Sequence, residues 1–160
     1  MGTDIHVYIE QKNPNGEWEF CGLYDRYTVN GDTVVEPGVT YCNRNYNLFS
    51  LLGEQWRGEY EVIVPMHGKP NDLSDEVYRM TLDEDTGEPS SYYFEYNWLT
   101  ISELDMVMDT LHKLRKLSKR DKRIYNTFRD FYAVVSNAMF QSARHISGRD
   151  NTRIVYWFDN

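Results

Sequence analysis

The chain has 160 residues with 17 Lys plus Arg, 25 Asp plus Glu, a formal net charge of −8 and 15% aromatic residues. This length fits one domain spanning residues 1–160, and 41% hydrophobic with 26% charged residues is typical of a folded globular chain. The acidic balance argues against duplex DNA as the main partner, because that binding depends on neutralising phosphates. The sequence contains no signal-peptide pattern and no apolar run of about 20 residues that would span a membrane, so we expect a cytoplasmic location.

The cysteines and histidines exclude several familiar kinds of site. Cys21 and Cys42 form no Cys-x-x-Cys pair, which argues against a disulfide framework or a zinc ribbon and favours small buried residues. The histidines are dispersed, and no metalloprotease, serine hydrolase or phosphate-loop motif is present. Any catalytic site must therefore combine distant segments of the chain.

The first predicted element is a strand over residues 5–11, because apolar side chains alternate there with His6, Tyr8 and Glu10. The turn run 13–16 and the alternating residues that follow it predict a β-hairpin. We expect short strands or an irregular loop over residues 28–43.

The middle of the chain predicts short elements separated by loops. A helix is expected over residues 45–52, with Gly53 ending it, and a second short helix over 74–80 with Ser74 as its cap. Residues 54–73 are expected to form a long ordered loop. An acidic excursion over 82–91 then leads to an aromatic strand over 92–98.

Two longer helices and a final strand complete the prediction. Thr100 and Glu103 form a capping-box pattern before a helix that extends to residue 114. Apolar residues at three- and four-residue spacing predict a second helix over 121–145. Residues 153–158 are apolar on both faces, which is typical of a central strand. This order predicts an α+β domain with an antiparallel or mixed sheet and two main helices packed on it.

The strongest candidate for chemistry lies in the first strand. Asp4 and His6 are two residues apart, so their side chains share one face of the strand. A carboxylate beside an imidazole can orient a general base or supply two ligands to a divalent metal. A metal would need a third ligand, for which His67 and Glu95 are candidates. A simple solvated strand face is the alternative.

Two further segments offer groups that recognise anions. Arg44, Asn45 and Tyr46 lie at the start of the predicted helix, where donors can face an anion; a capping Asn with a surface Arg is the alternative. Trp56 and Arg57 lie in a glycine-flanked loop, where they could stack on a base and bind a phosphate; a loop folded over the core is the alternative.

Seven basic residues gather at the junction of the two long helices. They are Lys113, Arg115, Lys116, Lys119, Arg120, Lys122 and Arg123. Their positive charge could attract an anionic ligand, an acidic partner or the acidic excursion of a second copy in a homo-oligomer, or it could be a solvated surface.

Five motifs stand out along the chain: the opening Met1-Gly2-Thr3-Asp4-Ile5-His6, the run Arg44-Asn45-Tyr46-x-Leu48-Phe49, the stretch Gly68-x-Pro70-x-Asp72-x-Ser74-x-Glu76-Val77, the triplet Trp98-Leu99-Thr100 and the ending Val155–Asn160. Together they resemble a family of small phage and prophage proteins, most of them uncharacterised. Family members often have Cys at position 3 and a His-Ser-His-Ser run where this chain has Phe94, Glu95, Tyr96 and Asn97. Glu95 could replace one of those histidines but not both.

The resemblance implies a phage accessory protein that acts in the host cytoplasm against a host defence. We expect it to bind a nucleotide-type immune signal, such as a cyclic oligonucleotide or an ADP-ribose derivative, with Tyr96 and Asn97 among the candidate binding residues. Cleavage would make it a phosphodiesterase-type hydrolase, with His6 as acid–base, Asp4 as its orienter and Arg44 facing the phosphate. Capture would use the same pocket without an activated water, and the missing histidines favour capture.

Two alternatives remain open. The chain could instead be a protein-binding inhibitor of a host defence enzyme with no small-molecule ligand. A structural role is the third hypothesis.

Overall fold

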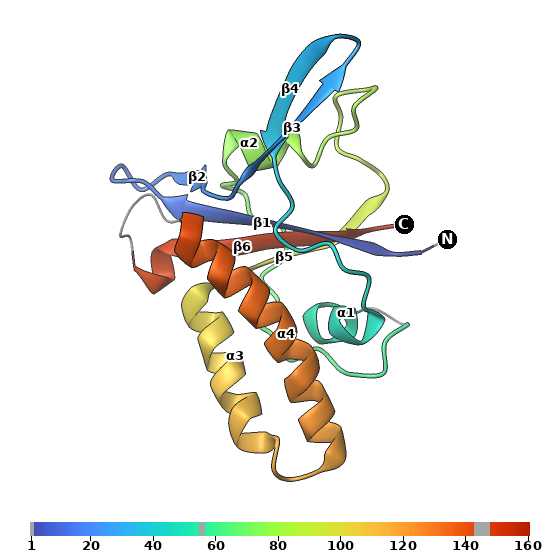
Figure 1. The fold of residues 1–160 in the computed structure, drawn as a ribbon, viewed down its shortest axis with the longest axis vertical. Coiled ribbons are helices and arrows are strands. Elements are labelled where there is room, and N and C mark those ends of the chain that lie inside the picture. Colours follow the sequence, from blue (N-terminus) through green and yellow to red (C-terminus); the bar gives the residue numbers. More distant parts are fainter. Residues whose placement is uncertain (1, 55–56, 143–147) are drawn as a thin grey trace.

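The fold comes from a computed structural model, which describes residues 2–54, 57–142 and 148–160. The strands are β1 (Asp4–Lys12), β2 (Trp18–Phe20), β3 (Tyr24–Val29), β4 (Asp32–Pro37), β5 (Tyr93–Thr100) and β6 (Thr152–Asp159). The helices are α1 (Tyr46–Leu52), α2 (Asp75–Arg79), α3 (Ile101–Leu114), α4 (Lys119–Ser142) and the 3-10 helix η1 (Arg149–Asn151). The α+β class is confirmed, with all elements in a single compact domain (Figure 1). Residues 143–145, which the sequence assigned to the last helix, lie outside the described residues.

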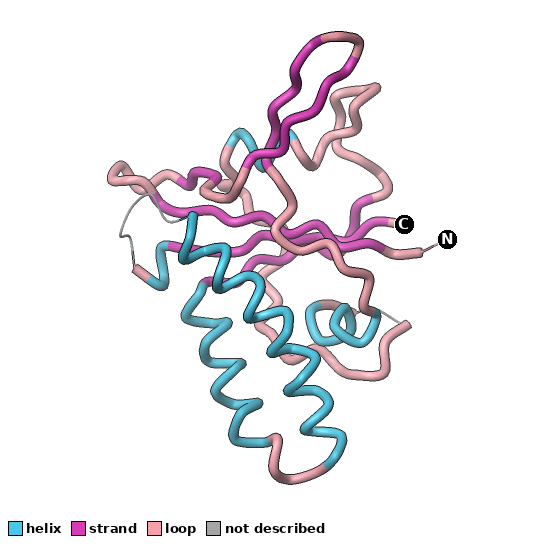
Figure 2. The backbone as a smooth tube through the Cα atoms, viewed as in Figure 1, coloured by secondary structure: helices cyan, strands magenta, loops and turns pink. Residues whose placement is uncertain are grey.

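A four-stranded sheet in the order β2-β1-β6-β5 forms the centre of the molecule (Figure 2). Its paired strands are antiparallel, which settles the alternative between an antiparallel and a mixed sheet. Strand β6 lies between β1 and β5, and its residues 152–158 are all buried. The prediction of a central strand covered on both faces is therefore confirmed.

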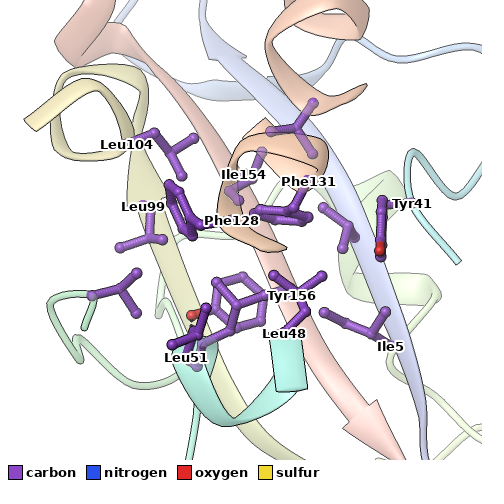
Figure 3. Close-up of a cluster of buried hydrophobic side chains, with 14 of the residues drawn as sticks. Ile5, Tyr41, Leu48, Leu51, Leu99, Leu104, Phe128, Phe131, Ile154 and Tyr156 are labelled. Atoms are coloured by element: carbon purple, nitrogen blue, oxygen red, sulfur yellow. Dashed lines mark hydrogen bonds between the residues drawn. The ribbon is translucent and has the colours of Figure 1, made fainter. Parts of the chain in front are cut away.

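One face of the sheet carries the larger hydrophobic core. The helices α1, α3 and α4 supply apolar residues at helical spacing, and these pack against the inward side chains of β1, β5 and β6 (Figure 3). The labelled members of this core are Ile5, Tyr41, Leu48, Leu51, Leu99, Leu104, Phe128, Phe131, Ile154 and Tyr156. Burial of these large side chains, at roughly 25 cal/mol per Å² of apolar surface, is the main force that fixes the helices on this face.

The other face of the sheet is covered over most of β1, so the alternative of a solvated strand face applies to the half-exposed Asp4 and not to the residues further along the strand. Tyr8 and Glu10 are both fully buried there. The reason is that residues 72–80 cross this face: Val77 of α2 packs with Tyr8 and Trp157, and the Ser74 amide donates to Glu10 Oε2 at 2.7 Å. Over residues 7–11, alternation along β1 therefore separates two buried layers.

Strands β3 and β4 form a separate hairpin that extends away from the main sheet (Figure 1). Its turn contains Asn30 and Gly31, both with positive φ, at 50° and 87°. An Asn-Gly pair suits this tight turn because both residues tolerate the left-handed region. The expectation of short strands or a loop over residues 28–43 was thus partly right, but the hairpin begins earlier, at Tyr24.

Helix α3 begins at the predicted capping box. The Thr100 hydroxyl accepts from the Glu103 amide at 3.2 Å, and the Glu103 carboxylate accepts from the Thr100 amide at 2.9 Å. Within the described ranges, no helix has both the length and the apolar character required to cross a bilayer. Of the two cysteines, Cys21 is buried as expected, whereas Cys42 is exposed.

We expect Thr100→Ala to lower the free energy of unfolding by about 1 kcal/mol, because the Glu103 amide loses its acceptor. Thr110→Ala is the matched control, since Thr110 lies exposed within the same helix. Alanine favours helix at that position, so the control should keep the wild-type free energy of unfolding. Urea unfolding of both variants measures the difference, and equal losses would contradict the capping role.

Candidate functional site

Asp4 and Arg44 meet at the edge of the sheet beside α1. The Arg44 guanidinium donates from Nε to Asp4 Oδ1 and from a terminal nitrogen to Asp4 Oδ2, both at 2.8 Å. Asp4 raises the pKa of Arg44 through this hydrogen bond. The guanidinium also packs over Gly2, where a Cβ atom would lie 2.2 Å from it. The two groups are therefore paired with one another, and about half of each side chain is exposed.

His6 lies next to this pair but contacts a different carboxylate. Its Nε2 lies 2.7 Å from Asp159 Oδ2, because β1 and β6 place Asp4 opposite Asp159 and His6 opposite Trp157. The imidazole stacks on Trp157 with 5.7 Å between ring centroids. Asp159, not Asp4, is thus the residue placed to orient His6. The sequence did not indicate it because the contact depends on the register between β1 and β6.

The residues at the start of α1 are occupied in structural contacts. The Asn45 side chain accepts from the Leu48 amide at 3.1 Å and so caps the helix. The Tyr46 hydroxyl accepts from the Thr3 amide at 3.3 Å and from Arg57 at 3.4 Å. These contacts, with the Thr3 amide as the largest effect, lower the pKa of Tyr46. The predicted partner Trp56 lies outside the described residues.

Glu95, Tyr96 and Asn97 lie at a β-bulge in β5 and point to different places. Glu95 has a φ of 50°, and its carboxylate lies close to Gly53. Tyr96 packs on Trp157 on the opposite face, and burial raises its pKa to about 12. Asn97 is fully buried, with its amide nitrogen donating to the Pro65 carbonyl and to the Tyr156 hydroxyl. The structure therefore does not bring these three side chains together.

His67 lines a pocket that we call the tryptophan pocket. It lies at the opposite end of the sheet from the Asp4–Arg44 pair and has a volume of about 440 Å³, which is within the range of roughly 300–1,000 Å³ of small-ligand sites. Its lining residues are Lys12, Trp18, His67, Lys69, Pro70, Asn71, Asp72, Trp98, Thr100, Asp150 and Arg153. His67 Nε2 lies 2.6 Å from Glu103 Oε1, and its ring stacks on Trp98 with 4.4 Å between centroids.

Arg153 forms the inner wall of this pocket. Its guanidinium lies 4.0 Å from the centre of the Trp18 ring and 5.4 Å from that of Trp98. It donates to Glu10 at 2.9 Å and to Asp72 at 2.9 Å, while only 2% of the side chain is exposed. The buried ion pair and the two indoles fix one another, so the wall of the pocket is preorganised.

Two lysines lie at the rim of the tryptophan pocket without an ion-pair partner among the described carboxylates. The Lys12 ammonium lies 5.2 Å from the centre of the Trp18 ring, and the Lys69 ammonium lies 4.5 Å from that of Tyr96. Asp72 is occupied by Arg153 and by the Trp18 indole N–H at 3.0 Å. Asp150, on η1, is the second carboxylate of the lining.

Sequence reasoning missed this pocket, apart from His67. Alternation along β1 places Lys12 on the same face as Glu10, and the same rule applied to β6 places Arg153 there. A polar residue within the apolar run 153–158 was the signal that could have indicated a buried ion pair. The contribution of Trp18 and Lys69 depends on loop paths that no local pattern indicates.

The described residues contain no cluster of three His, Cys, Asp or Glu side chains placed to bind a metal ion. Asp4 and His6, the candidate ligands, are bound to Arg44 and Asp159 respectively. Protein-family models, curated protein sequences and solved structures were compared with the chain, and none of the three comparisons gave a match.

Proposed function

We propose that the protein binds an anionic nucleotide-type ligand in the tryptophan pocket and sequesters it intact. The observation that carries this proposal is that Lys12 and Lys69, which form no ion pair with a described carboxylate, lie at the rim of a pocket walled by two indole rings. Ammonium groups bind phosphate, and aromatic side chains contact bases. The two chemistries are combined in nucleotides.

The other polar groups of the pocket suit the remaining parts of such a ligand. Asp150 can accept hydrogen bonds from a ribose hydroxyl or from an exocyclic amino group of a base. Arg153 is already bound to Glu10 and Asp72. We therefore assign phosphate recognition to the two lysines and a supporting role to Arg153.

Capture is favoured over hydrolysis by the placement of the groups that cleavage would use. Arg44 donates through two nitrogens to Asp4, so its charge is already paired with a carboxylate. His6 pairs with Trp157, which is four residues from Arg153 along β6. At 3.3 Å per residue this separation is about 13 Å. A phosphate bound by Lys12, at the Arg153 end of the sheet, would therefore lie outside hydrogen-bond reach of His6.

The resemblance to phage proteins suggests a biological setting for this capture. A phage accessory protein that sequesters a nucleotide-type immune signal would lower its free concentration in the infected host cell. In that setting the ligand would be a cyclic oligonucleotide or an ADP-ribose derivative.

We expect Lys12→Gln/Lys69→Gln to weaken binding at least tenfold, because each lost charge-assisted hydrogen bond to phosphate contributes about 1.5–3 kcal/mol. Titration calorimetry with a panel of cyclic di- and trinucleotides and ADP-ribose isomers measures the affinities. Lys113→Gln/Lys116→Gln is the control, since it changes the net charge equally at the helix junction, far from the pocket. The control should retain the wild-type affinity within about twofold.

Recovery of the intact ligand after heating the complex supports capture. Breakdown products that form with the wild-type protein and not with His6→Ala would show that the ligand is hydrolysed near His6, which would contradict capture. Equal losses of affinity in the two double variants would show that the ligand responds to the net charge of the protein and not to the two pocket lysines.

Failure of every panel member to bind would favour the second candidate function, a protein-binding inhibitor. One observation supports that candidate: the β3–β4 hairpin exposes Tyr27 and Val29 on one face. Neighbouring exposed apolar side chains can form part of a protein interface.

A further inference from the structure

A group of aromatic side chains continues from the tryptophan pocket along the same face of the sheet. His6, Tyr93 and Tyr96 pack around Trp157, with centroid distances of 5.7, 5.8 and 5.4 Å. Trp157 is fully buried and forms the floor of the group, whereas the other three rings are half-buried. We call His6, Tyr93 and Tyr96 the aromatic strip.

Lys69 connects the tryptophan pocket to the aromatic strip. It lines the pocket, and its ammonium lies 4.5 Å from the ring centre of Tyr96. Trp98 of the pocket and Tyr93 of the strip are separated along β6, because Trp98 pairs with Val155 and Tyr93 pairs with Asp159. Four residues at 3.3 Å each place the two side chains about 13 Å apart along the strand. One base bound beside Trp98 cannot also cover Tyr93.

The charges along this face indicate which part of a ligand each region would bind. Lys69, between the pocket and the strip, suits a phosphate. At the far end of the strip, Asp159 contacts His6, and Asp4 lies opposite Asp159. Asp4 is paired with Arg44, so Asp159 is the carboxylate that would disfavour a phosphate there, and that end suits an uncharged ring. Aromatic faces stack on any base, with no requirement for its identity.

We propose that the ligand contains two bases joined through a phosphodiester. One base occupies the tryptophan pocket, the linking phosphate lies at Lys69, and the second base stacks on Tyr93 in the aromatic strip. This inference rests on the proposed function and narrows it, because it favours an oligonucleotide over an ADP-ribose derivative, which has a single base.

The test compares a mononucleotide with a dinucleotide on matched variants. AMP and the linear dinucleotide pApA are titrated into the wild-type protein, Tyr93→Leu, Tyr93→Phe and Tyr92→Leu. Tyr92 is the control because it adjoins Tyr93 and is 63% exposed. We expect the wild-type protein to bind pApA about tenfold more tightly than AMP, which is the usual contribution of one stacked base.

Tyr93→Leu should lose this tenfold preference and retain wild-type affinity for AMP, which also shows that the pocket is still folded. Tyr93→Phe and Tyr92→Leu should keep the preference, since both retain the ring at position 93. Equal wild-type affinities for AMP and pApA would overturn the inference and leave the proposed function intact. Binding of neither probe, nor of any cyclic nucleotide or ADP-ribose isomer, would overturn both.

Discussion

Replacement of Arg153 by Met should lower the free energy of unfolding by about 3–5 kcal/mol, because it leaves a buried carboxylate without its partner. That carboxylate is Glu10, which is fully buried and accepts hydrogen bonds from Arg153 and from the Ser74 amide. Asp72, the other partner of Arg153, is 56% exposed, so water can solvate it after the substitution. Urea unfolding followed by tryptophan fluorescence measures the loss.

A second substitution distinguishes the stranded charge from simple loss of packing. In Glu10→Gln/Arg153→Met the buried group is neutral and still offers an oxygen to the Ser74 amide, so most of the lost stability should return. Arg129→Met is the matched control, since the Arg129–Asp130 pair is exposed and exposed pairs contribute about 0–1 kcal/mol. A loss below about 1 kcal/mol in Arg153→Met would contradict the role of the buried pair.

Asn97→Ala should lower the free energy of unfolding by about 1–3 kcal/mol, because the Pro65 carbonyl and the His67 amide lose the hydrogen bonds that the buried Asn97 side chain supplies. The Asn97 amide nitrogen donates to the Pro65 carbonyl at 2.9 Å, and its oxygen accepts from the His67 amide at 2.7 Å. The Tyr156 hydroxyl also loses a contact, but it keeps its hydrogen bond to the Leu52 carbonyl.

The substitution should weaken ligand binding as well as stability. Residues 65–67 are fixed to β5 by Asn97, and His67 packs on Trp98 in the wall of the tryptophan pocket. Urea unfolding and calorimetry under conditions where the variant is fully folded measure the two effects separately. Asn137→Ala is the control, because Asn137 is exposed on α4 and alanine favours helix there. An unchanged stability in Asn97→Ala would show that these backbone groups find other partners.

Local patterns predicted the elements well. Period-two alternation indicated β1, the capping box indicated the start of α3, and the apolar run 153–158 indicated a buried strand. These signals depend on neighbours within a few residues, and such neighbours are visible in a sequence. The Asn30-Gly31 pair is an equally local signal, and it predicts the turn of the β3–β4 hairpin.

Contacts between distant strands could not be predicted in this way. The partner of His6 is 153 positions away at Asp159, and only the β1–β6 register brings the two together. On spacing alone, the carboxylate nearest to His6 is Asp4 in the same strand. The tryptophan pocket was missed for the same reason, since its lining comes from residues between positions 12 and 153.

The position of β6 also has a consequence for how the chain acquires its structure. This strand is the last of the six to leave the ribosome, yet it is the one that joins β1 to β5. Until residue 159 has emerged, β1 lacks its longest ladder and β5 has no strand beside it. Pairing across such a sequence separation is slow, because a long loop must close before the contacts form. The newly made chain therefore exposes unpaired strand edges for longer than a domain built from local hairpins would.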